Sequence, residues 1–323
     1  MGTGPVLILA AALLWSVGGL GIKWLKESAA PDALAIAGWR SLFAIPLLVV
    51  GAGRGWGAVR PGTAFGVTAA TYAATLICLV AATTRTTAAN AILLQYTAPL
   101  WLMLAGLLMP GADRIGRRDV LLGAACLTGL GLFFGDRLSP EGMTGNVLAV
   151  VSGASFAAMT LSLRRQMAGV GGAAAPDPLP AVAAGNALVS LCCLPWMAAD
   201  VGKFGPVHWA VIAGLGTLQI GLPYLLFTRA VRHVAPVRAT LIAMVEPILN
   251  PVWVALFAAE VPGPWAMAGG AVLLSALAVD AVVPRAVTPK VAPPTPAEPL
   301  PAAAAVIPPV RPAPGAAARL PPP

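Results

Sequence analysis

One acidic residue of this sequence lies where an ionised carboxyl group is expensive. Glu246 is near the middle of an apolar stretch, residues 235–258. An acid at the centre of a membrane-spanning helix costs on the order of 3 kcal/mol on the insertion scale, and less when it faces water or a partner. If the stretch crosses a bilayer, Glu246 is therefore expected to point into a bundle of helices.

Two interpretations of Glu246 are open from the sequence. Burial favours the neutral form of a carboxyl group, so Glu246 is a candidate proton or cation site whose protonation is linked to which side of the protein is open. Alternatively, the carboxyl group hydrogen-bonds to backbone groups that Pro247 and Pro251 leave without helical partners. The first interpretation gives the residue a function, and the second gives it only a structural role.

Other polar and aromatic residues lie at a similar depth in further apolar stretches. Asn250 follows Glu246 at i+4 and so shares its helix face. All three tyrosines of the chain lie at this depth, not in the interfacial belts where aromatic residues usually collect. The candidates for lining a modestly polar, aromatic cavity are Trp15, Arg40, Tyr72, Gln95, Tyr96, Gln219, Tyr224 and Asn250. For any single one, ordinary hydrogen bonding between helices explains its position equally well.

Arg40 is a second charge inside an apolar stretch, residues 32–52. Three roles are open for it. Its guanidinium pairs with Glu246, or it contacts an anionic solute, or the long side chain extends outward to the membrane surface.

No residue pattern predicts an enzyme, a cofactor or a metal site. The two histidines, His208 and His233, lie at the ends of apolar stretches, and neither belongs to an HExxH motif or a ligand cluster. Ser155 stands in Gly-Ala-Ser-Phe-Ala, which lacks the second glycine of a nucleophile elbow. The four cysteines lie inside apolar stretches and are interpreted as small buried residues.

The elements that position these residues are predicted to be membrane-spanning helices. Of 323 residues, 58% are hydrophobic and 10% charged, and the mean hydropathy is +0.84, whereas soluble domains carry about a quarter charged residues. A spanning helix needs roughly 20 apolar residues. Ten stretches meet this length: 5–25, 32–52, 61–83, 86–109, 118–137, 143–164, 179–199, 206–232, 235–258 and 262–284.

The distribution of basic residues predicts the orientation of the chain. The net charge of +8 is spread between apolar stretches, so it indicates membrane orientation and not a nucleic-acid partner. With the N-terminus in the cytoplasm, twelve Lys and Arg fall on inside segments and five on outside loops. Both termini are therefore predicted to be cytoplasmic, at the inner membrane. Residues 285–323, rich in Pro and Ala, are predicted to be a disordered tail; a partner-binding role for its proline runs is the alternative.

The two halves of the chain resemble each other. Laying Pro99 on Pro247 aligns TTAANAILLQYTAPLW (86–101) with VAPVRATLIAMVEPIL (234–249). The repeats are predicted to span residues 1–140 and 141–284. Because each contains five helices, an odd number, the second enters the membrane from the opposite side, as an inverted repeat suited to alternating access.

This pairing also identifies candidate hinges and one asymmetry. Pro99 and Pro247 each remove a helical hydrogen bond at matched positions, which predicts symmetric kinks beside the cavity. Glu246 is matched by Ala98, so its chemistry belongs to one repeat only.

The sequence resembles the EamA family of the drug/metabolite transporter superfamily. Trp15 and the Arg40 of Gly-Trp-Arg-Ser-Leu-Phe contribute to the resemblance. The segments that carry it are TTAANAILLQYTAPLW (86–101), QIGLPYLLFTRAVRHV (219–234) and MVEPILNPVW (244–253). The resemblance implies ten helices in two inverted repeats, a central solute cavity and secondary transport, often the export of amino acids or other metabolites.

The chain departs from the family pattern in one place. The fourth helix of the family often ends in a Gly-Glu pair, whereas Met109-Pro110-Gly111-Ala112-Asp113 stands here; in the second half, Glu260 holds the comparable place. The acid of the first half is therefore lost or displaced.

The predicted function is the export of a small metabolite by alternating access, with proton coupling through Glu246 as the mechanistic hypothesis. A flippase for a lipid or lipid-linked substrate, and a channel-like permease, are the alternatives. The GxxxG spacings Gly62/Gly66 and Gly131/Gly135 favour close helix contacts, including contacts in a homodimer.

Overall fold

The computed structural model describes residues 2–59, 62–86, 88–108, 116–133, 142–167, 177–243, 245–258 and 264–282. All of them belong to the first of two compact units, residues 1–283. The predicted tail 285–323, the segment from Met109 to Asp113, Gly135 and Glu260 lie outside the described residues.

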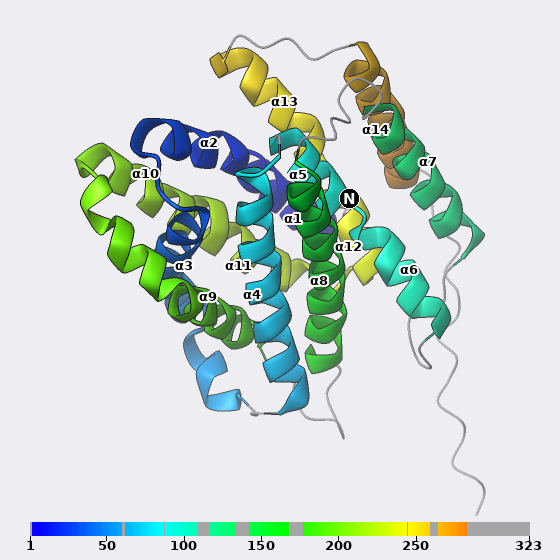
Figure 1. Cartoon of the computed structure of the whole chain (residues 1–323). Helices are drawn as coiled ribbons and strands as arrows, with labels where there is room; N and C mark the ends of the chain where they lie inside the picture. The colour runs from blue at the N-terminus through cyan, green and yellow to red at the C-terminus, as the bar shows by residue number, and fades with distance from the viewer. Residues whose placement is uncertain are drawn as a thin grey trace, which may run out of the picture. The chain divides into compact units, whose positions relative to one another are not determined.

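Every regular element in the described part of the chain is helical (Figure 1). The elements of the first half are α1 (Thr3–Trp15), α2 (Gly18–Ala29), α3 (Ala33–Ala52), η1 (Gly53–Ala58), α4 (Thr63–Thr83), α5 (Ala88–Gln95), α6 (Ala98–Leu108) and α7 (Arg117–Phe133). Those of the second half are α8 (Met143–Met167), α9 (Leu179–Asp200), η3 (Val201–Lys203), α10 (Pro206–Gly216), η4 (Thr217–Gly221), α11 (Leu222–Ala230), α12 (Pro236–Ala243), α13 (Val245–Ala258) and α14 (Pro264–Val282).

Six helices among the described residues are long and apolar enough to cross a membrane. They are Thr3–Ala29, Ala33–Ala52, Thr63–Thr83, Met143–Met167, Leu179–Lys203 and Pro206–Ala230. These six are the predicted first three spans of each half. The full count of ten stays a prediction.

Many large hydrophobic side chains lie exposed on the outside of the described helices. Large hydrophobic side chains that are more than half exposed include Val50, Leu108, Leu121, Leu191 and Phe257. Contiguous exposed apolar surface is rare on soluble monomers, whereas it carries no penalty against lipid.

Several predicted helices are interrupted beside the bundle centre. The first breaks into α1 and α2 after Trp15, the fourth breaks into α5 and α6 at Tyr96 and Thr97, and the eighth contains the π-helical turn η4. In the fourth helix the structure thus has a break just before Pro99 in place of a kink, and the role of Pro99 and Pro247 as hinges stays a prediction. Pro99 is instead the second residue of α6, where its missing N–H has no helical partner to lose. Pro247 likewise lies in the first turn of α13.

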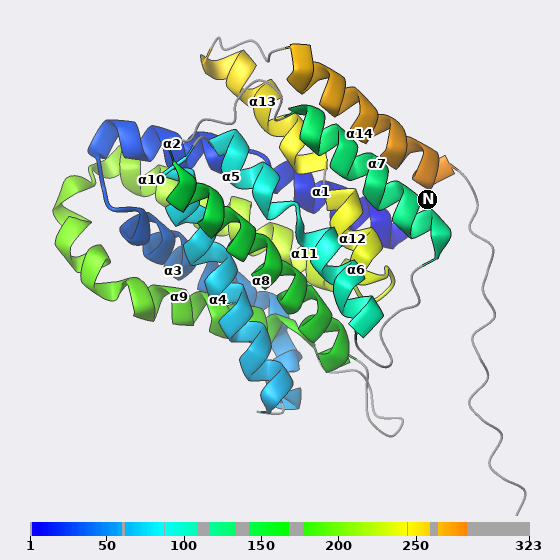
Figure 2. The same cartoon turned by 45° about the vertical axis from the view of Figure 1, so that its right-hand side comes forward.

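The helix contacts occur in pairs that match between the two halves. α4 packs along α8 as α11 packs along α1, and α5 contacts α8 as α12 contacts α1. In addition, α3 packs on α9, and α7 packs on α14, which lie side by side in both views (Figures 1 and 2). Each of these last two pairs joins a helix to its own repeat mate, as a two-fold relation between the halves requires.

The α3–α9 pair is antiparallel. At one end, the backbone N–H of Asp32, just before α3, donates to Oδ2 of Asp200 at the end of α9, at 2.5 Å. At the other end, Gly55 follows α3 and lies against Asp177, which precedes α9; a Cβ on Gly55 lies 2.7 Å from that of Asp177. Matched helices thus run in opposite directions.

The two aspartates that precede these helices act alike. Oδ1 of Asp32 accepts from the N–H of Leu34 at 2.8 Å, and Oδ1 of Asp177 accepts from the N–H of Leu179 at 3.0 Å. Both therefore satisfy one of the N–H groups that the start of a helix leaves without a partner. This correspondence is a local sign of the repeat that the sequence comparison did not use.

Glycine permits a close approach of two helices at Gly185. A Cβ there lies 2.7 Å from Cδ1 of Tyr72, so α9 and α4 can approach this closely only without a side chain. By contrast, a Cβ on Gly66 or Gly131 meets nothing within 4 Å. These two residues make no close helix contact inside the described chain, and the homodimer stays a prediction.

Candidate functional site

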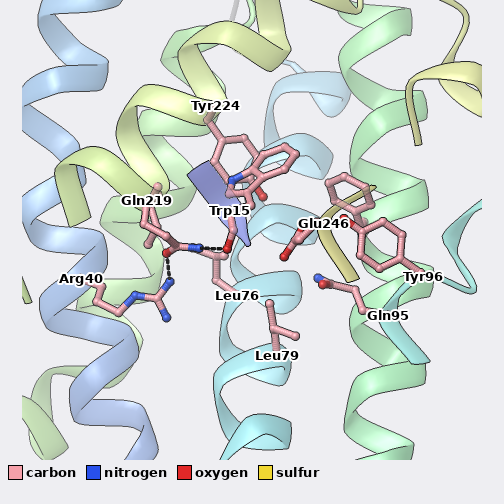
Figure 3. A pocket seen from close by; sticks show the side chains of 11 residues that line it. Trp15, Arg40, Leu76, Leu79, Gln95, Tyr96, Gln219, Tyr224 and Glu246 are labelled. Carbon is pink, nitrogen blue, oxygen red and sulfur yellow. Dashed lines mark hydrogen bonds between the residues drawn. The ribbon is translucent and has the colours of Figure 1, made fainter. Parts of the chain in front are cut away.

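A cavity of about 40 Å³ brings together most of the predicted site residues (Figure 3). Its lining residues are Trp15, Arg40, Leu76, Leu79, Gln95, Tyr96, Phe156, Gln219, Ile220, Tyr224 and Glu246. The residues up to Tyr96 belong to the first half of the chain and the others to the second, so the cavity lies between the halves. A volume of this size admits only a few water molecules. A metabolite therefore requires the bundle to widen.

Glu246 and Tyr96 form one side of the cavity. Glu246 is 8% exposed. The Tyr96 hydroxyl, at the break between α5 and α6, lies 2.5 Å from Oε2 of Glu246 and 2.7 Å from the carbonyl oxygen of Ala243. The backbone partner is thus Ala243, reached through Tyr96. In a continuous helix this carbonyl accepts from the N–H of residue 247, so it is a group that Pro247 leaves without a helical partner. The structural interpretation of Glu246 therefore stays open beside the functional one.

The proton count of this cluster favours a neutral Glu246. A phenol has one proton and can donate it to only one acceptor at a time. When Glu246 is neutral, its O–H donates to the Tyr96 oxygen while Tyr96 donates to the Ala243 carbonyl, and both acceptors are used. When Glu246 is ionised, the Tyr96 hydroxyl can donate to the carboxylate or to the Ala243 carbonyl, but not to both. The other buried acceptor then has no hydrogen bond from Tyr96, which costs about 1–3 kcal/mol.

Arg40 and Gln219 form the other side of the cavity. Nη2 of Arg40 donates to Oε1 of Gln219 at 2.5 Å, and Nε2 of Gln219 donates to the carbonyl oxygen of Trp15 at 3.2 Å. Trp15 ends α1, and the last carbonyls of a helix lack partners within it. Gln219 belongs to the π-helical turn η4, a feature often found at functional sites.

Two of the three roles expected for Arg40 are wrong in this structure. The side chain is 2% exposed, so it does not extend to the membrane surface. It also does not pair with Glu246, because its Nη2 donates to Gln219 while the Glu246 carboxyl group contacts the Tyr96 hydroxyl. Contact with an anionic solute is the role that stays open.

Aromatic rings also line the cavity. Ring centroids of Trp15 and Tyr224 lie 5.1 Å apart, and Phe156 lies 6.3 Å from Trp15. Tyr72 does not line the cavity in this conformation, because it lies fully buried with its ring centroid 4.7 Å from that of Tyr224. Its hydroxyl accepts from Nδ2 of Asn186 at 2.8 Å.

Of the remaining predicted residues, one lines the cavity and two have side chains outside the described part of the chain. Gln95 lines the cavity, and its Nε2 donates to Oγ of Ser152 at 3.0 Å. Asn250 and Pro99 belong to α13 and α6, and their side chains lie outside the described part of the chain. Asn186 was missed by the sequence analysis, although an amide within the apolar stretch 179–199 is the same signal that identified Gln219.

Six apolar spans, matched helix contacts and a polar cavity between the halves define a multi-pass membrane transporter. The model of the EamA-like transporter family matches residues 2–135 and 143–279, one match in each half. The chain belongs to this family, within the drug/metabolite transporter superfamily. The two matched ranges also confirm the predicted duplication.

The comparison with solved structures agrees on the fold. The crystal structure of another protein aligns with 85% of this chain and 96% of that chain, with a TM-score of 0.68 and 18% sequence identity. At this identity the likeness shows the fold alone. No curated protein matches the chain significantly.

Proposed function

We propose that this chain is a secondary transporter that exports a small organic metabolite, an amino acid or a similar solute, across the cytoplasmic membrane by alternating access. The observation that carries the proposal is the cavity between the halves, lined by polar and aromatic side chains of both. Transporters built from inverted repeats bind their solutes at such an interface, beside interrupted helices. The antiparallel arrangement of the matched helices α3 and α9 supports inversion of the repeats.

Proton coupling through Glu246 is the second part of the proposal. Only a proton on Glu246 lets the carboxyl group, Tyr96 and the Ala243 carbonyl all keep partners. Protonation thereby links the break between α5 and α6, where Tyr96 lies, to the end of α12. A proton arriving or leaving at this cluster changes the contacts between the two halves.

The experiment that tests the transport proposal starts with ligand discovery. A metabolite library is screened for thermal stabilisation of the purified protein, because a ligand of the folded state raises its stability by mass action. Each hit is then measured in proteoliposomes. We expect saturable uptake and counterflow, in which unlabelled solute inside drives entry of labelled solute. Flux that never saturates contradicts a carrier and favours a channel, and movement of labelled lipid favours a flippase.

Gly18→Ala tests whether the Arg40–Gln219 side of the cavity takes part. A Cβ on Gly18 collides with the Gln219 amide and lies 2.7 Å from its Cδ, so the amide must leave its present position, in which it contacts Arg40 and the Trp15 carbonyl. Loss of a hydrogen bond to a charged group costs about 1.5–3 kcal/mol. We therefore expect the apparent affinity for the solute found in the screen to fall by roughly tenfold or more, as measured by its thermal stabilisation of the protein.

Gly214→Ala is the matched control. A Cβ at Gly214 meets nothing within 4 Å, so the substitution changes helix propensity without touching the cavity. Unchanged affinity in Gly18→Ala, or an equal loss in both variants, contradicts the assignment of Gln219 to the site.

A further inference from the structure

Arg40 is a buried cation whose hydrogen-bonding capacity is largely unused. Its side chain is 2% exposed and it lines the cavity. A guanidinium offers five N–H donors. Nη2 donates to Gln219, whereas Nε and Nη1 have no hydrogen-bond partner among the residues that the structure describes. Buried donors without partners are costly, so the position demands a ligand or another compensation.

The charge of Arg40 is also uncompensated in the described part of the chain. Its partner Gln219 is neutral, and the carboxyl group of Glu246 contacts Tyr96 and not Arg40. Because a buried charge is tolerated mainly when it is paired, an apolar residue here would stabilise the fold better. The structure therefore keeps a cation at this position at the expense of stability.

We propose that Arg40 and Gln219 form an anion subsite that takes the carboxylate of a small organic monoanion. The proposal rests on the proposed function and names the substrate class that the cavity accepts. A guanidinium matches a planar carboxylate with two parallel hydrogen bonds. Gln219, held by the Trp15 carbonyl, fixes the orientation of the guanidinium, and the rings of Trp15 and Tyr224 contact the rest of the ligand.

The charges of the cavity select a monoanion over a dianion. Arg40 is the single cationic side chain among the lining residues, and the opposite side carries an acid, Glu246. One positive charge balances one carboxylate, whereas the second negative charge of a doubly charged phosphate has no cationic partner among the described lining residues.

The test measures binding by the full-length protein in lipid nanodiscs, without any transport step. The probes are sodium acetate and sodium benzoate, each compared with its uncharged amide, acetamide and benzamide, at an ionic strength held constant with sodium chloride. We expect both carboxylates to raise the melting temperature of the wild type and both amides to leave it unchanged. Acetate is small enough to suit the cavity in its present conformation.

Arg40→Met is expected to weaken the apparent affinity for the carboxylates at least tenfold and to leave the melting temperature without ligand equal or higher. Arg40→Gln takes its place if the Met variant does not fold. Arg40→Lys keeps the positive charge but lacks the planar guanidinium that donates two parallel hydrogen bonds. It is expected to bind the carboxylates with an affinity between those of the wild type and Arg40→Met. Lys23→Met removes a surface charge, since Lys23 is about half exposed, and should keep the carboxylate effect.

Three outcomes overturn the subsite: amides stabilise as well as carboxylates, no carboxylate stabilises the wild type, or the variants of Arg40 keep the effect. Failure of the proposed function looks different. In that case no solute shows counterflow in proteoliposomes, while the difference in melting temperature between acid and amide is still observed.

Discussion

Replacing Glu246 by Gln is expected to abolish the pH dependence of transport while the protein stays folded. Gln has nearly the shape of a neutral glutamic acid and keeps a hydrogen bond with Tyr96, but it binds no proton. In the wild type, we expect the counterflow rate to change by about tenfold or more between acidic and alkaline pH, a usual size for coupling between two sites. In Glu246→Gln, the rate should be flat across the same range.

A second measurement reports on Glu246 without any solute. Infrared difference spectra of the wild type across a pH titration should contain the C=O band of a neutral carboxyl group that disappears on ionisation, and Glu246→Gln should lack this band. Tyr96→Phe is the matched control, because it keeps the acid and removes the hydroxyl that joins it to Ala243. We expect Tyr96→Phe to shift the pH profile, not to flatten it. An unchanged rate and pH profile in Glu246→Gln removes this residue from the mechanism.

The sequence predicted which residues are unusual but not which of them meet. Glu246 and Tyr96 were each identified by their depth in an apolar stretch, and they are 150 positions apart along the chain. Arg40 and its partner Gln219 are separated by 179 positions. Such pairs depend on the packing of helices from different repeats, and hydropathy carries no information about that packing. For this reason three roles for Arg40 stayed open until the structure placed it.

Hydropathy also predicts the depth of a residue but not its rotation about the helix axis. Tyr72 and Tyr224 are both deep and aromatic, yet only Tyr224 lines the cavity, while Tyr72 contacts Asn186 behind it. Pro99 indicated that the fourth helix is irregular near Tyr96. A proline, however, is compatible both with a kink and with the start of a new helix. The π-helical turn around Gln219 is likewise followed by a proline, Pro223, which has no N–H for the Gln219 carbonyl.

Removal of the Asp200 carboxylate is expected to open one end of the α3–α9 pair. Asp200 is 6% exposed; it accepts from the Asp32 N–H at 2.5 Å and pairs with Lys203, whose Nζ lies 2.7 Å from Oδ1. The hydrogen bond from Asp32 fastens the start of α3 to the end of α9, whereas the pair with Lys203 is local and holds the carboxylate in place. Hydrogen bonds to a charged group contribute about 1.5–3 kcal/mol, which corresponds to roughly a 10- to 150-fold change in an equilibrium constant.

In Asp200→Ala, we therefore expect the population that is open at this end to grow by at least about tenfold. The measurement is pulsed electron paramagnetic resonance in nanodiscs, with spin labels on Ser28→Cys and Gly202→Cys in a chain whose native cysteines are replaced. Both labelled positions are exposed, and they lie on α2 and η3, on the two sides of the contact. A longer distance between labels should become populated in the variant.

Asp177→Ala is the matched change at the opposite end, and its effect should have the opposite sign. Asp177 caps α9 as Asp32 caps α3, but its ion pair with Arg232, at 3.3 Å, is partly exposed and so worth less. If the two repeats exchange conformations about α3 and α9, weakening one end shifts the population toward opening there and away from opening at the other. Asp177→Ala should therefore reduce the long-distance population that Asp200→Ala increases. Shifts in the same direction, or an unchanged distance distribution in Asp200→Ala, are incompatible with alternating access about this helix pair.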